Sequence, residues 1–100
     1  MLRGRVYMAD LGYGEKPFAV VSNNARNGKL DSYLAVRITT SSKPKLPSII
    51  ELDSGDPLVG RALCDDIVIL FEEDLKRDVG ALSPQTLMRL GAGLRHALAL

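Results

Sequence analysis

A continuous apolar segment near the N-terminus limits what this chain can fold into. Its residues, Pro17 to Val21, follow the charged pair Glu15-Lys16 and precede the polar turn formers Ser22-Asn23-Asn24. A short apolar run that is rich in valine and bounded by polar residues is typical of a strand buried on both faces. Proline fits at the first position of such a strand, where no ladder N–H is required. The sequence therefore predicts a buried strand with an acid and a base at its entrance, which makes Glu15 and Lys16 the first candidates for chemistry.

Several other segments have the length and composition of short strands. They are Gly4–Asp10, Tyr33–Thr39, Ser48–Leu52 and, in two pieces on either side of Asp65-Asp66, Arg61–Phe71. Polar connections separate them, among them the flexible loop over residues 11–14 and the segment 22–29, where Asn27-Gly28 is a strong turn signal. Short strands at this spacing indicate a small barrel or a sandwich.

The C-terminal segment has a different pattern. Ser83-Pro84 is a good helix start, with serine as the cap and proline at the first helical position. Leucines at positions 87, 90, 94 and 98 then form one apolar stripe that would pack against the strands. Gly91 and Gly93 weaken a helix, and they can instead permit close approach to a neighbouring element. We expect a single mainly β domain (α+β) over residues 1–100, built of antiparallel strands with a C-terminal α-helix.

Composition narrows the functional classes. No stretch approaches the roughly 18 apolar residues of a membrane span, and the N-terminus lacks the apolar core of a signal peptide, so we expect a cytoplasmic protein. Cys64 is the only cysteine and His96 the only histidine, which argues against a disulfide, a zinc site or any other metal cofactor. Residues 1–50 carry eight Lys/Arg and three acids, net +5, whereas residues 51–100 carry five and nine, net −4. The basic half favours an anionic partner such as RNA or an acidic peptide.

Five motifs, taken in order, resemble one known family. They are Arg3-Gly4-Arg5-Val6-Tyr7 with Ala9-Asp10-Leu11; Pro17 to Asn24 with Asn27; Ile38-Thr39 with the hydroxyl-rich loop and Leu46-Pro47; Leu63-Cys64-Asp65; and Gly80 to Pro84 before the helix. Together they resemble the MazF/PemK toxins of type II toxin–antitoxin systems, which are mRNA interferases. The resemblance spans nearly the whole chain.

The resemblance implies an SH3-like small β-barrel that forms a homodimer and binds single-stranded RNA. It implies cleavage of mRNA at a short motif without a metal or other cofactor. In that reaction the ribose 2′-OH attacks the adjacent phosphorus and leaves a 2′,3′-cyclic phosphate and a 5′-OH. It also implies an acidic, MazE-like antitoxin as the partner that neutralises the toxin.

The family's catalytic pair is an arginine before the first buried strand and a threonine at the end of the next strand. These positions correspond to Lys16 and Thr39, with Glu15 as a further candidate base. The chemistry requires a base, an acid and donors to the phosphorane oxygens. For RNA binding we expect a set of cationic, hydroxyl and aromatic side chains, namely Arg37, Thr40, Ser41, Ser42, Lys43, Lys45 and Tyr13.

Two departures from the family pattern leave alternatives open. Lys16 keeps the charge of the family arginine but lacks its planar fork, so the catalytic load could rest on Lys16 or shift to Arg37 and Glu15. Asp66 and Val68 replace the family's common glutamine and arginine. One alternative is a catalytically silent family member that still binds antitoxin. Another is a CcdB-like gyrase poison, although that class depends on a Trp-Gly-Ile ending and this chain has no tryptophan.

Overall fold

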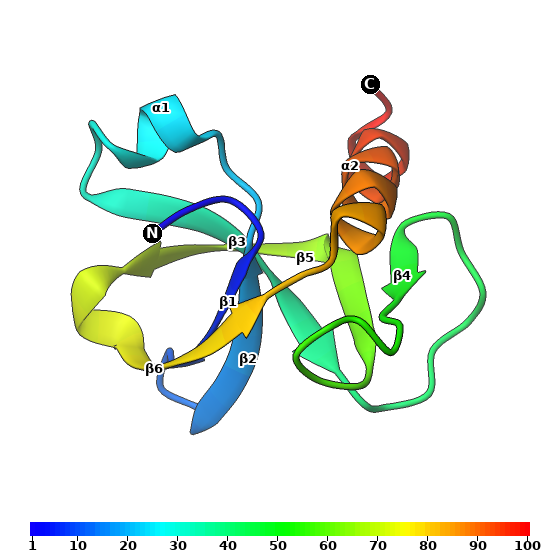
Figure 1. Ribbon diagram of the computed structural model, residues 1–100, viewed down its shortest axis with the longest axis horizontal. Helices are drawn as coiled ribbons and strands as arrows, with labels where there is room; N and C mark the ends of the chain where they lie inside the picture. The colour runs from blue at the N-terminus through cyan, green and yellow to red at the C-terminus, as the bar shows by residue number, and fades with distance from the viewer.

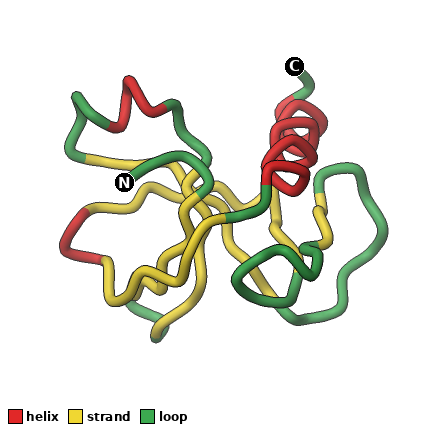
Figure 2. The backbone as a smooth tube through the Cα atoms, in the orientation of Figure 1, coloured by secondary structure: helices red, strands yellow, loops and turns green.

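Six strands and two helices make up the structure, a computed structural model that describes residues 1–100 (Figure 1, Figure 2). In chain order they are β1 (Arg5–Asp10), β2 (Glu15–Val20), α1 (Asn24–Asn27), β3 (Ser32–Thr39), β4 (Ile49–Glu51), β5 (Arg61–Phe71), β6 (Leu75–Ala81) and α2 (Pro84–Leu98). A short 3₁₀ turn over Glu72–Asp74 connects β5 to β6. No helix is long and apolar enough to cross a membrane.

All strands belong to one antiparallel sheet with the order β4-β5-β3-β2-β1-β6. The predicted fold class, mainly β with antiparallel strands and a C-terminal helix, is confirmed. The structure differs from the expected barrel in one respect. The edge strands β4 and β6 do not pair with each other, so the sheet is curved but open. Figure 1 shows these two edges on opposite sides of the molecule.

The predicted buried strand lies inside the sheet, between β1 and β3. Ala19 packs into one hydrophobic cluster, whereas Phe18 and Val20 pack into a second cluster on the opposite face. Burial on both faces is therefore confirmed. Pro17 is the third residue of β2 and not the first. It is accommodated because the ladder to β3 begins only at the next residue, where Phe18 pairs with Arg37.

The two predicted pieces of Arg61–Phe71 form one strand that contains a β-bulge. Val36 of β3 lies opposite Ile67, but the next residue, Arg37, lies opposite Leu63. The residues between Leu63 and Ile67 are left out of this register. A bulge increases twist and bends the strand, and this lets the first half of β5 also pair with the short edge strand β4.

The C-terminal helix begins as predicted, with the Ser83 hydroxyl accepting the Thr86 N–H and proline at the first turn. Leu90 is fully buried in the first hydrophobic cluster, and Leu87 and Leu94 pack against it. Leu98 is 53% exposed, so the apolar stripe ends one turn earlier than expected.

Of the two helical glycines, one is required for close packing. A Cβ at Gly93 would lie 2.8 Å from the Cys64 sulfur and 2.9 Å from Ile50 Cδ1. At Gly91 the nearest atom is an Arg3 guanidinium nitrogen at 3.7 Å. Close approach of α2 to the sheet therefore depends on Gly93.

Two elements were not expected from the sequence. The edge strand β6 reads Leu-Lys-Arg-Asp-Val-Gly-Ala, and its charges hide a strand pattern because an edge strand in contact with solvent tolerates them. It pairs with β1, where an Arg5–Asp78 ion pair of 2.7 Å links the two strands. The polar connection after β2 contains the short helix α1, capped by the Asn23 side chain and ended at Gly28.

Candidate active site

A hollow of about 490 Å³ opens at the end of the sheet where β2 begins and β3 ends. It is lined by Met8, Lys16, Pro17, Arg37, Ile38, Thr39, Thr40, Ser41, Leu58 and Val59. We call it the β2–β3 pocket. It brings together five of the residues singled out in the sequence, from two strands and the loop that follows β3.

Strand geometry explains why these side chains meet. The β2–β3 ladder stops at the pair Phe18–Arg37, and extending the same register by two residues would set Lys16 opposite Thr39. Alternate residues of a strand project to the same face. Lys16 therefore projects from the same strand face as Phe18, and Thr39 from the same face as Arg37. Lys16 is held from its other side, where it pairs with Ala9 of β1.

Arg37 is the most unusual polar residue of the pocket. Its Nε is buried and has no hydrogen-bond partner, the one such buried side-chain atom in the structure. Neither Arg37 nor Lys16 takes part in an ion pair; the ion pairs present involve other cations. Buried donors in proteins are normally paired, so an unpartnered guanidinium nitrogen is unusual. Arg37 lines the pocket and has no carboxylate partner, so its positive charge is available to an anion there.

Thr39 is oriented by the loop that follows it. Its Oγ1 accepts the Ser41 backbone N–H at 3.1 Å, so the hydroxyl proton stays available for an acceptor in the pocket. The guanidinium of Arg61 donates to the Ser41 carbonyl at 3.2 Å and forms a 2.8 Å ion pair with Glu51. The backbone after Thr39 is thus fixed from the side of β4 and β5.

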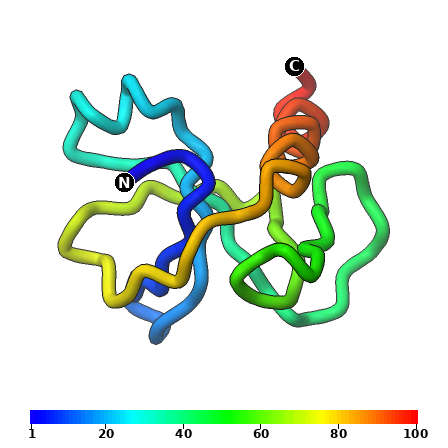
Figure 3. The backbone as a smooth tube through the Cα atoms, in the orientation of Figure 1, coloured from blue at the N-terminus to red at the C-terminus, as the bar shows by residue number.

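Other expected residues lie outside the pocket. Lys43 and Lys45 line a neighbouring hollow of about 420 Å³ together with Arg61 and Glu51, and Ser42 lines neither hollow. Figure 3 shows the loop after β3 running along the same side of the molecule as β4. These lysines are therefore placed beside the pocket and not in it.

Glu15 and Tyr13 also lie outside. Glu15 is exposed and does not line the pocket, because it is next to Lys16 in the strand and alternate residues project to opposite faces. Tyr13 is 85% exposed on the loop between β1 and β2. That loop is held at its base, where the Asp10 carboxylate accepts the N–H groups of Gly12 and Gly14.

The lone cysteine and histidine are not part of the pocket. Burial, followed by the nearby Asp65 carboxylate, raises the pKa of the Cys64 thiol to about 11, so Cys64 is a neutral buried residue. His96 lies at the end of α2 in a shallow depression with Arg95 and Leu100. No three His, Cys, Asp or Glu side chains are grouped so that they could hold a metal ion.

The two β5 residues that differ from the family pattern, Asp66 and Val68, also lie away from the pocket. Asp66 is exposed in the bulged part of the strand, and Val68 packs against the second hydrophobic cluster. Neither lines the pocket.

Three apolar residues of the pocket were missed by the sequence reasoning. They are Met8 from β1 and Leu58 and Val59 from the loop between β4 and β5. A search for titratable and hydroxyl side chains does not find apolar walls. The only local signal for this loop was the turn-forming segment 53–57.

Residues 2–98 match the family described as PemK-like, MazF-like toxin of type II toxin–antitoxin system. Endoribonuclease MazF1 of Mycobacterium bovis and endoribonuclease MazF4 of Mycobacterium tuberculosis are each 40% identical over 99 residues, which covers 99% of this chain and 93% of either relative.

The solved structures agree. A mycobacterial endoribonuclease in complex with its cognate antitoxin superposes with a TM-score of 0.95 at 40% identity, covering 100% of this chain and 96% of the other. MazF in a MazE–MazF complex of Deinococcus radiodurans, at 20% identity, shares the fold with a TM-score of 0.83, covering 100% and 96%. This chain belongs to the PemK/MazF toxin family of type II toxin–antitoxin systems.

Proposed function

We propose that this protein is a toxin endoribonuclease that cleaves single-stranded mRNA at a short motif without a metal ion. The observation that carries the proposal is the position of Lys16, Arg37 and Thr39 around one pocket, with the Nε of Arg37 buried and unpartnered. A cationic pocket with a free hydroxyl fits a phosphodiester. Relatives at 40% identity that bear the name endoribonuclease support the assignment.

The proposed reaction is an internal transesterification. The ribose 2′-oxygen forms a bond to phosphorus, the bond from phosphorus to the 5′-oxygen breaks, and the products are a 2′,3′-cyclic phosphate and a 5′-OH. The proton of the 2′-OH passes to a base, and the leaving 5′-oxygen receives a proton. Negative charge grows on the nonbridging oxygens in the transition state, where donors placed in advance are most effective.

Each pocket residue has a role in this scheme. Arg37, which lines the pocket and has no ion-pair partner, donates to a nonbridging oxygen, and the Thr39 hydroxyl donates to the same phosphate. Lys16 supplies the remaining positive charge and transfers the proton to the leaving oxygen. Glu15, beside Lys16 at the start of β2 but on the opposite strand face, is the candidate base that accepts the 2′-OH proton. Thr40 and Ser41 offer further hydroxyls to the RNA, and Ser42, Lys43, Lys45 and Tyr13 are the proposed contacts to nucleotides farther along the strand.

The proposed toxin is a cytoplasmic homodimer. Its proposed protein partner is an acidic antitoxin. A carboxylate-rich peptide would compete for the same unpaired cations, Lys16 and Arg37, that bind phosphate. The likeness to an endoribonuclease solved with its cognate antitoxin supports this partner.

The test is cleavage of a long single-stranded RNA by the purified protein in EDTA, with both ends of the fragments mapped. We expect cuts at one short motif that leave 5′-OH ends. Intact RNA at high protein concentration would contradict the proposal and support a silent, antitoxin-binding toxin. Loss of cutting in EDTA would contradict metal independence. Inhibition of gyrase with intact RNA would identify a CcdB-like poison.

A further inference from the structure

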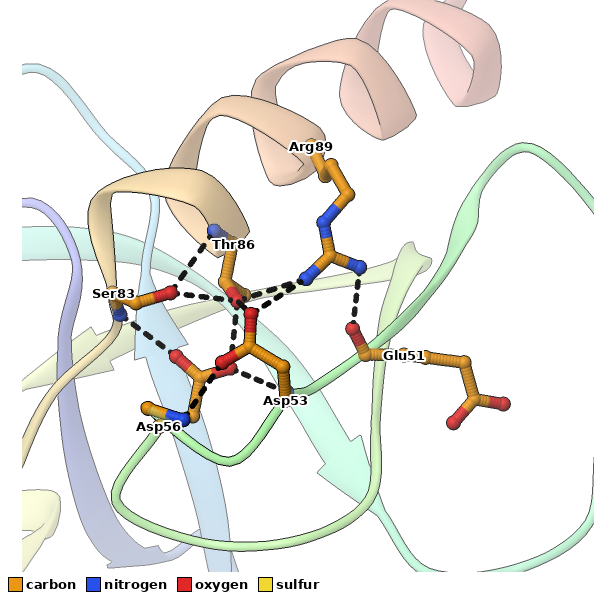
Figure 4. A network of polar contacts seen from close by, with 7 residues as sticks. Glu51, Asp53, Asp56, Ser83, Thr86 and Arg89 are labelled. Atoms are coloured by element: carbon orange, nitrogen blue, oxygen red, sulfur yellow. Dashed lines mark hydrogen bonds and ion pairs between the residues drawn. The ribbon is translucent and has the colours of Figure 1, made fainter.

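The loop between β4 and β5, residues 53–60, is fastened at its first half to the start of α2. Figure 4 shows the network that does this. We call it the clamp; it joins Asp53 and Asp56 of the loop to Ser83, Thr86 and Arg89 of the C-terminal helix and its cap. The Asp56 carboxylate accepts the Ser83 N–H at 2.7 Å and the Thr86 hydroxyl at 2.6 Å. Arg89 donates to the Glu51 carbonyl at 2.8 Å. Thr86 is completely buried, so the loop is anchored to the interior.

The other half of the loop ends against the β2–β3 pocket. Gly60 has a φ of +136°, and a Cβ there would lie 2.6 Å from the Thr39 carbonyl oxygen. Its own carbonyl accepts the Leu52 N–H at 3.0 Å, which closes the base of the loop. The loop therefore joins the clamp at one end to the proposed catalytic threonine at the other.

Between these two anchors the loop presents an apolar wall to the pocket. Both Leu58 and Val59 line the pocket. Leu58 is partly buried and packs against the first hydrophobic cluster, whereas Val59 is 77% exposed. Val59 lines the same pocket as Arg37 and Thr39. An exposed valine on an anchored loop contributes little to folding. Its surface becomes useful when something apolar enters the pocket.

A nucleotide has the two chemistries that this pocket offers. Its phosphate needs donors, which Lys16, Arg37 and Thr39 supply, and its base has an apolar face that gains free energy when it leaves water. We propose that Val59, supported by Leu58, packs against the base of a nucleotide that flanks the scissile phosphate. Val59 is then a substrate-positioning residue, and the clamp holds it in place.

This inference rests on the proposed endoribonuclease function and adds to it a base-binding wall. An anchored loop loses little conformational freedom on binding, so contact with the base is not offset by ordering of the loop. The wall carries no hydrogen-bonding side chain. It therefore fixes where the base lies, while hydroxyls such as those of Thr40 and Ser41 are left to distinguish one base from another.

The experiment compares Val59→Ala with Met88→Ala on the mapped RNA motif. Met88 is a matched control because it is also 77% exposed but lies on α2 outside the pocket. We expect Val59→Ala to raise KM about tenfold, as the loss of two methyl contacts would, with kcat changed much less. Met88→Ala should match the wild type.

Two further RNA substrates sharpen the test. Each nucleotide that flanks the cut is replaced in turn by one that keeps the ribose hydroxyls but lacks the base. If Val59 packs on a base, the tenfold difference between Val59→Ala and the wild type disappears on one of these two RNAs, because the contact is already lost.

The outcomes separate the two proposals. Wild-type protein that fails to cut RNA overturns the proposed function and the inference with it. Wild-type protein that cuts RNA while Val59→Ala behaves like Met88→Ala overturns the inference alone. A Val59→Ala defect that persists unchanged on both base-free RNAs also overturns it.

Discussion

The clamp and the β2–β3 pocket each contain an arginine and a threonine, but the side chains of the clamp pair with one another and those of the pocket do not. In the clamp, Thr86 Oγ1 accepts from Ser83 and Arg89 and donates to Asp56. In the pocket, Thr39 Oγ1 accepts one backbone N–H, and Arg37 leaves a buried Nε without a partner. Polar groups that satisfy one another stabilise the fold, whereas those left unpaired are available to a ligand. The clamp should therefore govern stability and the pocket activity.

The largest effect is expected from removing the pocket lysine. Lys16→Ala should lower kcat by about 100- to 10,000-fold, because proton transfer to the leaving oxygen is lost. Its free energy of unfolding should stay within about 0.5 kcal/mol of the wild type, since Lys16 has no ion-pair partner. The measurements are single-turnover RNA cleavage and urea unfolding. Lys29→Ala, an exposed lysine outside the pocket, is the control. Wild-type activity in Lys16→Ala would move the catalytic role to Glu15 or Arg37.

The same substitution at the two threonines tests the comparison directly. Thr39→Val should reduce cleavage by about 100-fold or more through loss of a donor to the phosphate, with little change in stability. Thr86→Val should lower the free energy of unfolding by about 1–3 kcal/mol, because it leaves buried clamp atoms unpaired.

Unfolding curves and cleavage rates are measured on both valine variants. Thr86→Ser, which keeps the hydroxyl, should recover most of the stability lost in Thr86→Val. Equal losses of stability in Thr39→Val and Thr86→Val would refute the division between clamp and pocket.

Acid should weaken the clamp. Burial alone would raise the pKa of Asp56, but hydrogen bonds from Thr86 and from the N–H groups of Asp53 and Ser83 outweigh it and lower that pKa below its ordinary 3.8. A carboxyl whose pKa is lower in the folded state stabilises the fold above its unfolded pKa. That contribution is lost as the pH falls through the folded value.

The Asp56 contribution is measured as the difference in Tm between wild type and Asp56→Asn, followed from about pH 6 down to about pH 2. We expect the difference to shrink below about pH 4. A difference that stays constant over this range would show that the charge of Asp56 does not stabilise the clamp.

The smallest effect concerns the lysines beside the pocket. Replacing both Lys43 and Lys45 with glutamine should leave kcat nearly unchanged and weaken RNA binding mainly at low salt. Each lost phosphate contact should reduce the slope of log K against log salt by about 0.7. The measurement is a salt titration of RNA binding, with Lys29→Gln/Lys76→Gln as a control of equal charge. An unchanged slope would place the RNA path elsewhere.

The sequence was most informative where one local rule decided the structure. The buried strand followed from the unbroken run Pro17–Val21, and the start of α2 followed from Ser83-Pro84, because periodicity and capping depend on nearby residues. The edge strand β6 was missed since its charges, such as Asp78, suit the solvent side of an edge and mask the alternation that identifies a strand.

The site was predictable only in part for a similar reason. The family pattern singled out Lys16 and Thr39, and strand spacing added Arg37, two residues before Thr39; the structure brings all three to one pocket. The wall residues Leu58 and Val59 could not be found, because their place in the pocket depends on a loop held from the far end of the chain by Ser83, Thr86 and Arg89. No local pattern encodes a contact of that range.

The close approach of α2 at Gly93 has a consequence for oxidation chemistry. The helix covers the single thiol of the chain. The raised pKa of Cys64 keeps the side chain in its protonated thiol form, which is less reactive than the thiolate. Peroxide and thiol reagents should therefore modify Cys64 only in molecules whose helix has lifted from the sheet. The rate of thiol labelling would then report how often α2 detaches, and rapid labelling of the folded protein would show that the helix does not protect the thiol. We therefore expect no control of activity by oxidation of Cys64 in the folded protein.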